Sequence, residues 1–374
     1  MKRQISLIVA LLLIMVLPVA GAELPPAPRG TFTVVVIPDT QSYRGRGTKS
    51  QPDSTDDVTN PNFETLTAWI TDHLEAQRIV FVTHVGDIVD RNVPDQWQVA
   101  QSCMDRLHGL VPYGISVGNH DMTHDGDSSL FQEYFGARRF EGFDWYGGCY
   151  PGSQDAGTAI SGNNADSYQL ISAQGIDLLV LHLECNAPDD VLAWAAKVLE
   201  RYPDRRAIIT THMGLGPLHS PTSSEGWFDD PKGRMLWHKV HGERGNTPQQ
   251  VWEKLTSRYP NIMLVLHGDQ SRTQSMRLDS VAQHGNTVHE IMFDCGGGQN
   301  VRLLRFTPAR NRIDVITYDV RNKQLVDRTS VVENRDQWQF TLHCELGGEA
   351  PSTSGPITPR SDPALRWVGR PMFR

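Results

Sequence analysis

Several apolar segments of this sequence stop at a short polar segment that carries Asp, Asn or His. The apolar segments are short, rich in Val and Ile, and typical of buried β-strands. In α/β folds, ligands bind beyond the carboxyl ends of the strands. We therefore predict that these polar segments converge in space, although they lie far apart along the chain. They are residues 39–41, 86–90, 118–121, 211–212 and 267–269.

The order of the predicted elements indicates an α/β fold. Strands and helices alternate through the first part of the chain, and strands follow one another near its end. This order favours two packed sheets with helices on the outside. Strands are predicted over residues 31–37, 79–85, 113–117, 176–183, 207–211, 262–266, 288–293, 301–306, 313–320 and 338–342, helices over 63–74, 94–107, 189–201 and 249–259, and long loops over 44–60, 122–166 and 214–246.

The first residues are typical of a secretory signal peptide. Lys2 and Arg3 precede an apolar run, and Ala20, Gly21 and Ala22 supply the small residues of a cleavage site. The apolar run is shorter than the roughly 20 residues that a membrane span needs. We therefore predict a signal peptide and a secreted or periplasmic location, with an uncleaved anchor as the alternative. No later segment is apolar enough to span a bilayer.

The predicted domain boundaries follow the composition of the chain. The signal peptide covers residues 1–22, and the Pro-rich residues 23–30 are predicted to be a linker. Residues 31–345 are predicted to form one domain. The Pro-, Ser-, Thr- and Gly-rich residues 346–374 are predicted to be a disordered tail, because such a composition buries too little apolar surface to fold.

Charge and cysteine content narrow the classes of partner. The formal net charge is −8 and no long Lys/Arg block occurs, so the sequence does not indicate a nucleic-acid-binding surface or an anionic membrane as partner. The five Cys residues leave at least one thiol unpaired in a monomer, and no CxxC pair points to a structural zinc site.

The polar strand ends resemble the motifs of the calcineurin-like metallophosphoesterases. That family's usual pattern is DxH, GDxxD, GNH[DE], a lone His and then GHxH. This chain has Asp39-Thr40-Gln41, Gly86-Asp87-Ile88-Val89-Asp90, Gly118-Asn119-His120-Asp121, Thr211-His212 and His267-Gly268-Asp269. The resemblance covers roughly residues 31–320. It implies an α/β fold with four layers, in which two mixed β-sheets form a sandwich flanked by helices.

The resemblance also implies a centre of two divalent metal ions. A pair of ions a few ångströms apart needs a bridging carboxylate with several oxygen and nitrogen ligands. Asp87, the first Asp of GDxxD, takes the place of the family's bridge. By the same resemblance, Asp39 and Asp269 would hold the first metal, and the second metal would be held by Asn119, His212 and His267.

This chain departs from the family pattern at two positions. Gln41 stands where DxH has His, and Asp269 stands where GHxH has its second His. The first metal site would then consist of oxygen donors, which favours Mn²⁺ or Mg²⁺ over Zn²⁺. The second site keeps its imidazoles and suits Mn²⁺, Fe²⁺ or Zn²⁺. Gln41 is either a direct ligand or a neighbour that acts through water.

Three further residues are predicted to act in catalysis. His120 resembles the family's catalytic His, which would protonate the leaving oxygen or stabilise the phosphoryl charge. The carboxylate of Asp90 would orient that imidazole. Arg91 follows Asp90 as it does in the phosphoprotein phosphatases, where such an Arg grips phosphate through two hydrogen bonds. The match ends at Asn92, so a surface role for Arg91 stays open.

These features lead to two hypotheses for function. The first is an exported, metal-dependent phosphoesterase in which a hydroxide that bridges the two metals attacks a phosphate mono- or diester. The second is a phosphoesterase-fold binding protein with little or no turnover, which the substitutions at Gln41 and Asp269 motivate. The substrate would be a small molecule or another phosphoester, chosen by the loops over 44–60, 122–166 and 214–246.

Overall fold

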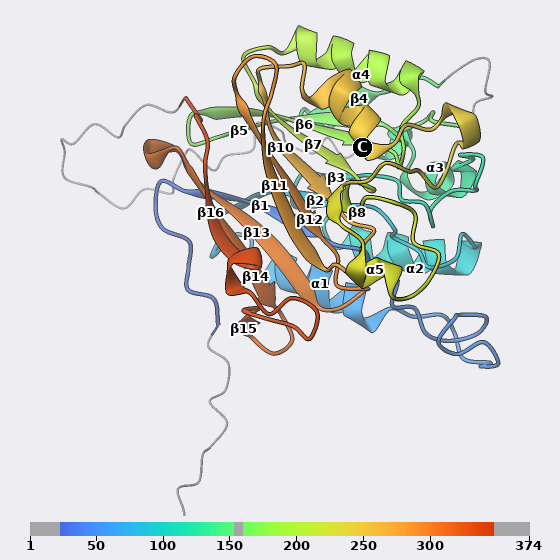
Figure 1. Ribbon diagram of the computed structural model, residues 1–374. Helices are drawn as coiled ribbons and strands as arrows, with labels where there is room; N and C mark the ends of the chain where they lie inside the picture. Colours follow the sequence, from blue (N-terminus) through green and yellow to red (C-terminus); the bar gives the residue numbers. More distant parts are fainter. Residues whose placement is uncertain (1–22, 153–159, 348–374) are drawn as a thin grey trace, which may run out of the picture.

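Two large β-sheets pack face to face between layers of helices in the computed structural model, which describes residues 23–152 and 160–347 (Figure 1). Helix α4 lies over one sheet, and helices α1 and α2 lie against the other. The predicted α/β sandwich of two mixed sheets is confirmed. The predicted signal peptide and most of the predicted tail lie outside the described residues.

The first sheet has seven strands in the order β15-β14-β13-β1-β2-β3, with β16 also paired to β14. Strands β1, β2 and β3 run parallel, and β13 runs antiparallel to β1. The carboxyl ends of the three parallel strands therefore meet at one edge. The bounds are β1 Phe32–Ile37, β2 Ile79–His84, β3 Tyr113–Ile115, β13 Asn300–Thr307, β14 Arg312–Asp319, β15 Gln324–Leu325 and β16 Gln339–His343.

The second sheet has seven strands in the order β11-β12-β10-β7-β6-β5-β4. Strands β6, β7, β10 and β12 run parallel, whereas β4, β5 and β11 run antiparallel to their neighbours. The bounds are β4 Tyr146–Cys149, β5 Ser167–Ala173, β6 Ile176–Leu183, β7 Arg206–Thr211, β10 Ile262–His267, β11 Ser275–Val281 and β12 Thr287–Phe293. A separate two-stranded sheet joins β8 (Leu215–Pro217) to β9 (Lys232–Arg234).

The helices cover the outer faces of the sandwich. Helix α4 buries an apolar stripe against β6 and β7, and the residues of α1 and α2 share a core with the first sheet. Asn60 caps α1 by accepting a hydrogen bond from the backbone N–H of Phe63 at 3.1 Å. The bounds are α1 Pro61–Asp72, α2 Pro94–Asp105, α3 Ser129–Phe135, α4 Asp189–Arg201, α5 Gly226–Asp229 and α6 Pro248–Val251, with single turns η1 Ala137–Arg139, η2 Gly242–Arg244, η3 Trp252–Thr256, η4 Pro308–Arg310 and η5 Arg335–Gln337.

Strand β5 was not predicted, although the sequence carries a signal for it. It pairs with β6 in a hairpin whose turn residues, Gln174 and Gly175, both have positive φ values of 51° and 76°. Two residues in that conformation form the tight turn whose twist suits a β-hairpin. Polar and apolar residues alternate before this turn, which is the pattern of a strand with one exposed face.

Buried polar contacts between the two sheets fix the position of one sheet relative to the other. The hydroxyl of Thr83 on β2 lies 2.9 Å from both the Thr210 hydroxyl on β7 and Nε2 of His182 on β6. Ser116, just after β3, donates to the carbonyl of Leu183 at 2.6 Å. These contacts lie near the carboxyl ends of their strands, so they fix how the strand ends of one sheet face those of the other.

Candidate metal centre

Three buried side chains from both sheets form a cluster that suits a cation. One ligand atom from each of Asp39, Asp87 and His212 lies within 4.8 Å of the others. Asp39 follows β1, Asp87 follows β2 and His212 follows β7. Nε2 of His212 lies 3.1 Å from Oδ1 of Asp87, and Nδ1 lies 2.9 Å from the Val85 carbonyl. Because Nδ1 can donate to that carbonyl, Nε2 is left to bind a cation, as in most metal-binding imidazoles.

The backbone at the strand ends turns two carboxylates toward the cluster. Asp87 and Asp269 have φ values of 51° and 72°, in the left-handed region that Asp tolerates better than most residues. The turn after β3 packs closely against the first of them. A Cβ atom at Gly118 would lie 2.2 Å from the Asp87 backbone nitrogen, so only glycine fits there.

A lysine side chain contacts two more of the predicted ligands, Asp269 and Asn119. Oδ1 of Asp269 lies 3.6 Å from Nε2 of His212, which places Asp269 beside the cluster. The ammonium of Lys239 contacts Asp269, and its Nζ lies 3.4 Å from Oδ1 of Asn119. Lys239 comes from the loop over residues 214–246 and was not predicted, because a single lysine in a polar loop carries no sequence signal.

Gln41 and His267 lie differently with respect to the cluster. Gln41 donates from Nε2 to Oδ2 of Asp87 at 2.9 Å, so it contacts the predicted bridging carboxylate directly. The ring of His267 lies with Nδ1 3.3 Å from the Thr211 carbonyl and Nε2 3.6 Å from Oε1 of Glu290. His267 is therefore outside the group formed by Asp39, Asp87 and His212 in this conformation.

His120 borders the cluster, and its partner differs from the expected one. Its backbone N–H donates to Oδ1 of Asp87 at 2.9 Å, and Nε2 lies 4.0 Å from Oδ2 of the same residue. Nδ1 lies 2.8 Å from the backbone carbonyl of Asp90, whereas the Asp90 carboxylate pairs with Lys49 at 2.5 Å. Asp90 thus positions the imidazole through its main chain, because its side chain faces the loop over residues 44–60. Arg91 has an exposed side chain.

The buried carboxylates at the cluster favour positive charge beside them. Burial raises the pKa of Asp39 well above its ordinary value, and the neighbouring charge of Asp294 raises it further. Burial also raises the pKa of Asp294 to about 7. Burial alone would lower the pKa of His212, but the charges of Asp87 and Asp39 raise it well above its ordinary value. Each of these three shifts favours the protonated form, so the site favours added positive charge, and the donor set fits a divalent ion that would supply it.

Asp294 is a further acidic residue that the sequence analysis missed. It follows β12 as Asp39 follows β1, so the same strand-end rule could have found it. Its Oδ1 accepts a hydrogen bond of 2.6 Å from the backbone N–H of Gly296. The run of glycines after it forms a turn that packs on the first predicted motif, because a Cβ at Gly297 would lie 2.7 Å from the Ser42 nitrogen.

Comparison with known proteins identifies the family. Residues 32–272 match the sequence profile of the calcineurin-like phosphoesterases. The chain belongs to this family. It is 30% identical over 334 residues to the uncharacterized protein YvnB of Bacillus subtilis, an alignment that covers 86% of this chain but 22% of YvnB. The chain thus spans less than a quarter of the length of this relative.

Three solved structures show a weak similarity to this chain. A 5′-nucleotidase precursor from Thermus thermophilus superposes with a TM-score of 0.43 at 12% identity, covering 86% of this chain and 56% of that one. The NAD nucleotidase NadN of Haemophilus influenzae gives 0.41 at 12% identity, covering 74% and 48%. The calcineurin-like phosphoesterase YfkN of Bacillus subtilis gives 0.35 at 10% identity, covering 78% and 86%.

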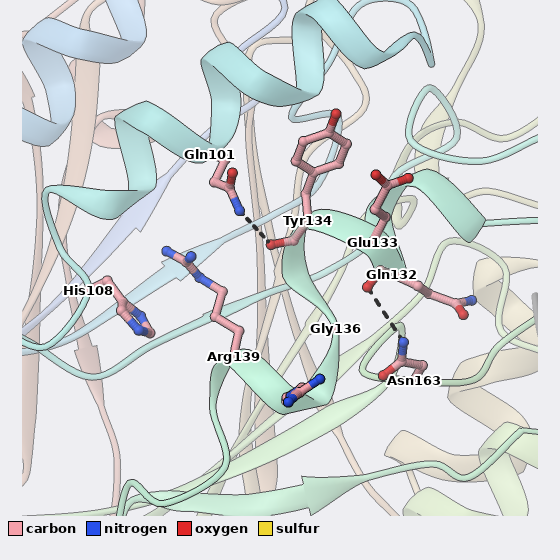
Figure 2. Close-up of a pocket in the computed structure, with 9 residues that line it drawn as sticks. Gln101, His108, Gln132, Glu133, Tyr134, Gly136, Arg139 and Asn163 are labelled. Atoms are coloured by element: carbon pink, nitrogen blue, oxygen red, sulfur yellow. Dashed lines mark hydrogen bonds between the residues drawn. The ribbon is translucent and has the colours of Figure 1, made fainter. Parts of the chain in front are cut away.

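A cavity of about 550 Å³ lies apart from the strand-end cluster, between α2, α3 and the turn η1 (Figure 2). Its lining contains none of the predicted site residues. Arg139, whose side chain extends toward Gln101 in Figure 2, is already paired with the Asp105 carboxylate and the Tyr113 hydroxyl. The strand-end cluster, and not this cavity, contains predicted metal ligands.

A second buried acidic group lies next to the metal-site strand ends. Glu184 follows β6, and its carbonyl accepts a hydrogen bond of 3.2 Å from the hydroxyl of Thr211. Its carboxyl group contacts the Ser161 hydroxyl, and Oε1 lies 3.4 Å from Nε2 of His241. Asp166 accepts a 2.9 Å hydrogen bond from the Glu184 backbone N–H. Burial raises the pKa of Glu184 to about 8.

We expect Glu184→Gln to make the protein relatively more stable as the pH rises. The folded state binds the Glu184 proton more tightly than the unfolded state does. The bound proton therefore makes its full contribution to the free energy of unfolding at acidic pH. It is lost as the pH rises toward about 8. The difference between variant and wild type should grow by up to about 1.4 kcal/mol per pH unit between about pH 5 and about pH 8. Urea unfolding across this range measures it.

The exposed Glu133 supplies the control for this experiment. Glu133→Gln removes the same carboxyl group from an exposed position, so the comparison isolates the effect of the buried position of Glu184. If the free energy of unfolding varies with pH in the same way in Glu184→Gln and Glu133→Gln, Glu184 is ionised in the folded protein and the raised pKa is wrong.

Proposed function

We propose that this chain is an exported, metal-dependent phosphoesterase that hydrolyses phosphate mono- or diesters at a centre of two divalent cations. The observation that supports it best is the buried convergence of Asp39, Asp87 and His212 from three strand ends, with His120 at its border. Export is proposed from the signal-like residues 1–22. None of the helices in the described part of the chain has the length and hydrophobicity of a bilayer span.

The proposed ligands divide between the two ions by chemistry. Asp39, Asp269 and the bridging Asp87 would hold the first ion. Asn119 and the two imidazoles, His212 and His267, would hold the second. Gln41 contacts Asp87, so it either orients the bridge or turns its amide oxygen to the first ion. When bound, such ions activate water and neutralise the charge of a phosphate group.

The chain's own groups position the reaction around these ions. His120 is held by the Asp90 carbonyl and by Asp87, so its Nε2 has a fixed direction from which it can give a proton to the leaving oxygen. Asp87 is held in turn by Gln41 and by the His120 backbone. Each acting group is therefore placed by a second one before substrate arrives, which lowers the cost of reorganisation during the reaction.

We expect hydrolysis by the metal-stripped protein to return best with Mn²⁺ or Mg²⁺ and less with Zn²⁺. The first site is built from oxygen donors, which bind hard ions without a strong preference for borderline ones. The measurement is the hydrolysis of a generic aryl phosphate and its diester after addition of each ion. If no ion restores hydrolysis of either ester, the phosphoesterase proposal fails and the binding-protein hypothesis takes its place.

A double variant tests which side chains set this preference. Replacing both Gln41 and Asp269 with His recreates the DxH and GHxH patterns of the family and should shift the preference toward Zn²⁺ or Fe²⁺. The two single variants are the matched controls, because one imidazole beside a remaining carboxylate changes the donor set less. An unchanged metal profile in the double variant would mean that these two residues do not control the first site.

A further inference from the structure

Lys239 is a basic side chain that contacts two of the proposed metal ligands. Its ammonium contacts the carboxylate of Asp269, and its Nζ lies 3.4 Å from Oδ1 of Asn119. These two side chains are assigned to different ions in the proposed centre. The Lys239 side chain is 23% exposed, so it lies at the edge of the centre and has access to solvent.

The backbone of Lys239 is fixed to the second sheet. Its N–H donates to Oδ1 of Asn186 at 2.9 Å, and Asn186 also donates to the carbonyl of Asn246 at 3.0 Å. Asn186 lies two residues beyond Glu184, after the end of β6. Val240, which follows Lys239 in the chain, is buried. A change of partner for the ammonium therefore requires rotation of the lysine side chain alone, without movement of the loop.

Metal binding would change the partners available to this ammonium. Asp269 and Asn119 would hold the ions through the same oxygens that Lys239 contacts, so a bound ion would compete with the ammonium and would add positive charge beside it. The centroid of the uncharged Trp237 ring lies 5.8 Å from Nζ. An anion bound to the ions would bring new negative charge to the ammonium.

We propose that Lys239 is a phosphate-positioning residue that exchanges Asp269 for a phosphate oxygen when the centre is loaded. In the metal-free protein its ammonium balances the buried carboxylate of Asp269. In the loaded protein the same ammonium donates a hydrogen bond to the bound phosphate. This inference rests on the proposed function for the two-ion centre and adds a residue to it.

The exchange has opposite consequences for two binding reactions. Lys239 competes with the cation for Asp269, so its removal should leave Mn²⁺ affinity equal or higher. Lys239 contributes a charge-assisted hydrogen bond to phosphate, so its removal should weaken phosphate binding. A side chain that only supported the fold would lower both affinities together.

The experiment measures both affinities by titration calorimetry for wild type, Lys239→Gln and Lys239→Arg. Mn²⁺ is titrated into metal-stripped protein, and inorganic phosphate into Mn²⁺-loaded protein. We expect Lys239→Gln to bind phosphate roughly 10- to 100-fold more weakly while its Mn²⁺ affinity does not fall. Lys239→Arg should recover most of the phosphate affinity, because it keeps the charge.

Lys232 provides a matched control from the same loop. Its ammonium contacts the backbone carbonyls of Trp227, Phe228 and Asp230, so Lys232→Gln perturbs the loop without touching the proposed ligands. It should bind Mn²⁺ and phosphate as the wild type does. If Lys239→Gln binds phosphate normally, or loses Mn²⁺ and phosphate together, the proposal is overturned.

Hydrolysis of the aryl phosphate separates this inference from the proposed function. A wild type that hydrolyses the ester but binds phosphate independently of Lys239 keeps the function and refutes the role of Lys239. A wild type that hydrolyses neither ester but binds phosphate through Lys239 supports the role of Lys239 in anion binding and refutes the hydrolase. A wild type that takes up no Mn²⁺ overturns both, whereas one that takes up Mn²⁺ and binds no phosphate overturns the role of Lys239 alone.

Discussion

Replacing Asp87 with Asn is expected to abolish hydrolysis and to lower the metal content of the protein. Oδ1 of Asp87 lies 2.9 Å from the backbone nitrogen of His120 and 3.1 Å from Nε2 of His212. Its Oδ2 lies 2.9 Å from Nε2 of Gln41. An amide lacks the two anionic oxygens of the proposed bridging carboxylate, so both ions of the proposed centre would lose a ligand. Turnover should fall by at least about 10²- to 10³-fold, as when a principal charge-stabilising group is removed.

Metal analysis and aryl phosphate hydrolysis, measured on the same Asp87→Asn sample, test this prediction. Asp125→Asn is the matched control, because Asp125 is exposed in the loop that follows the His120 motif. It should keep wild-type metal content and turnover. Near-normal turnover of Asp87→Asn would place the active site elsewhere in the molecule.

Replacing His120 with Ala is expected to lower turnover while the metal content is kept. The His120 side chain is one-third exposed, and its Nε2 lies 4.0 Å from the nearest Asp87 carboxylate oxygen. The ring is therefore at the border of the cluster, where it can reach a leaving group. General acid–base groups typically contribute about 10²- to 10⁴-fold to the rate, so turnover should fall by that order.

The neighbouring His124 serves as the control for His120. Its side chain is exposed and its backbone carbonyl, not its ring, contacts His241. His124→Ala should therefore leave turnover unchanged. Loss of metal together with turnover in His120→Ala would move His120 into the coordination shell of the ions.

Most of the fold could be predicted from the sequence, and the errors have local causes. The apolar strands and the amphipathic helix α4 repeat with clear periods, so their place in two packed sheets followed from pattern alone. The strands that were missed include β5 and β11, besides the short strands β4, β8, β9 and β15. The exposed faces of β5 and β11 carry polar residues, which weakens the apolar signal of a strand. They were decided by pairing with β6 and β12, which the sequence does not display.

Some features of the candidate site could likewise be predicted from the sequence, and others depend on the tertiary structure. The sequence by itself determined which residue types stand at the strand ends, because a buried strand must stop at a polar turn and Asp tolerates the left-handed conformation that Asp87 and Asp269 adopt. Only the tertiary structure decided that Asp90 positions His120 through its carbonyl and that Lys239 reaches Asp269. These contacts depend on how two sheets are held in register and on a loop fixed by Asn186. Such long-range packing depends on the whole hydrophobic core, and no single motif encodes it.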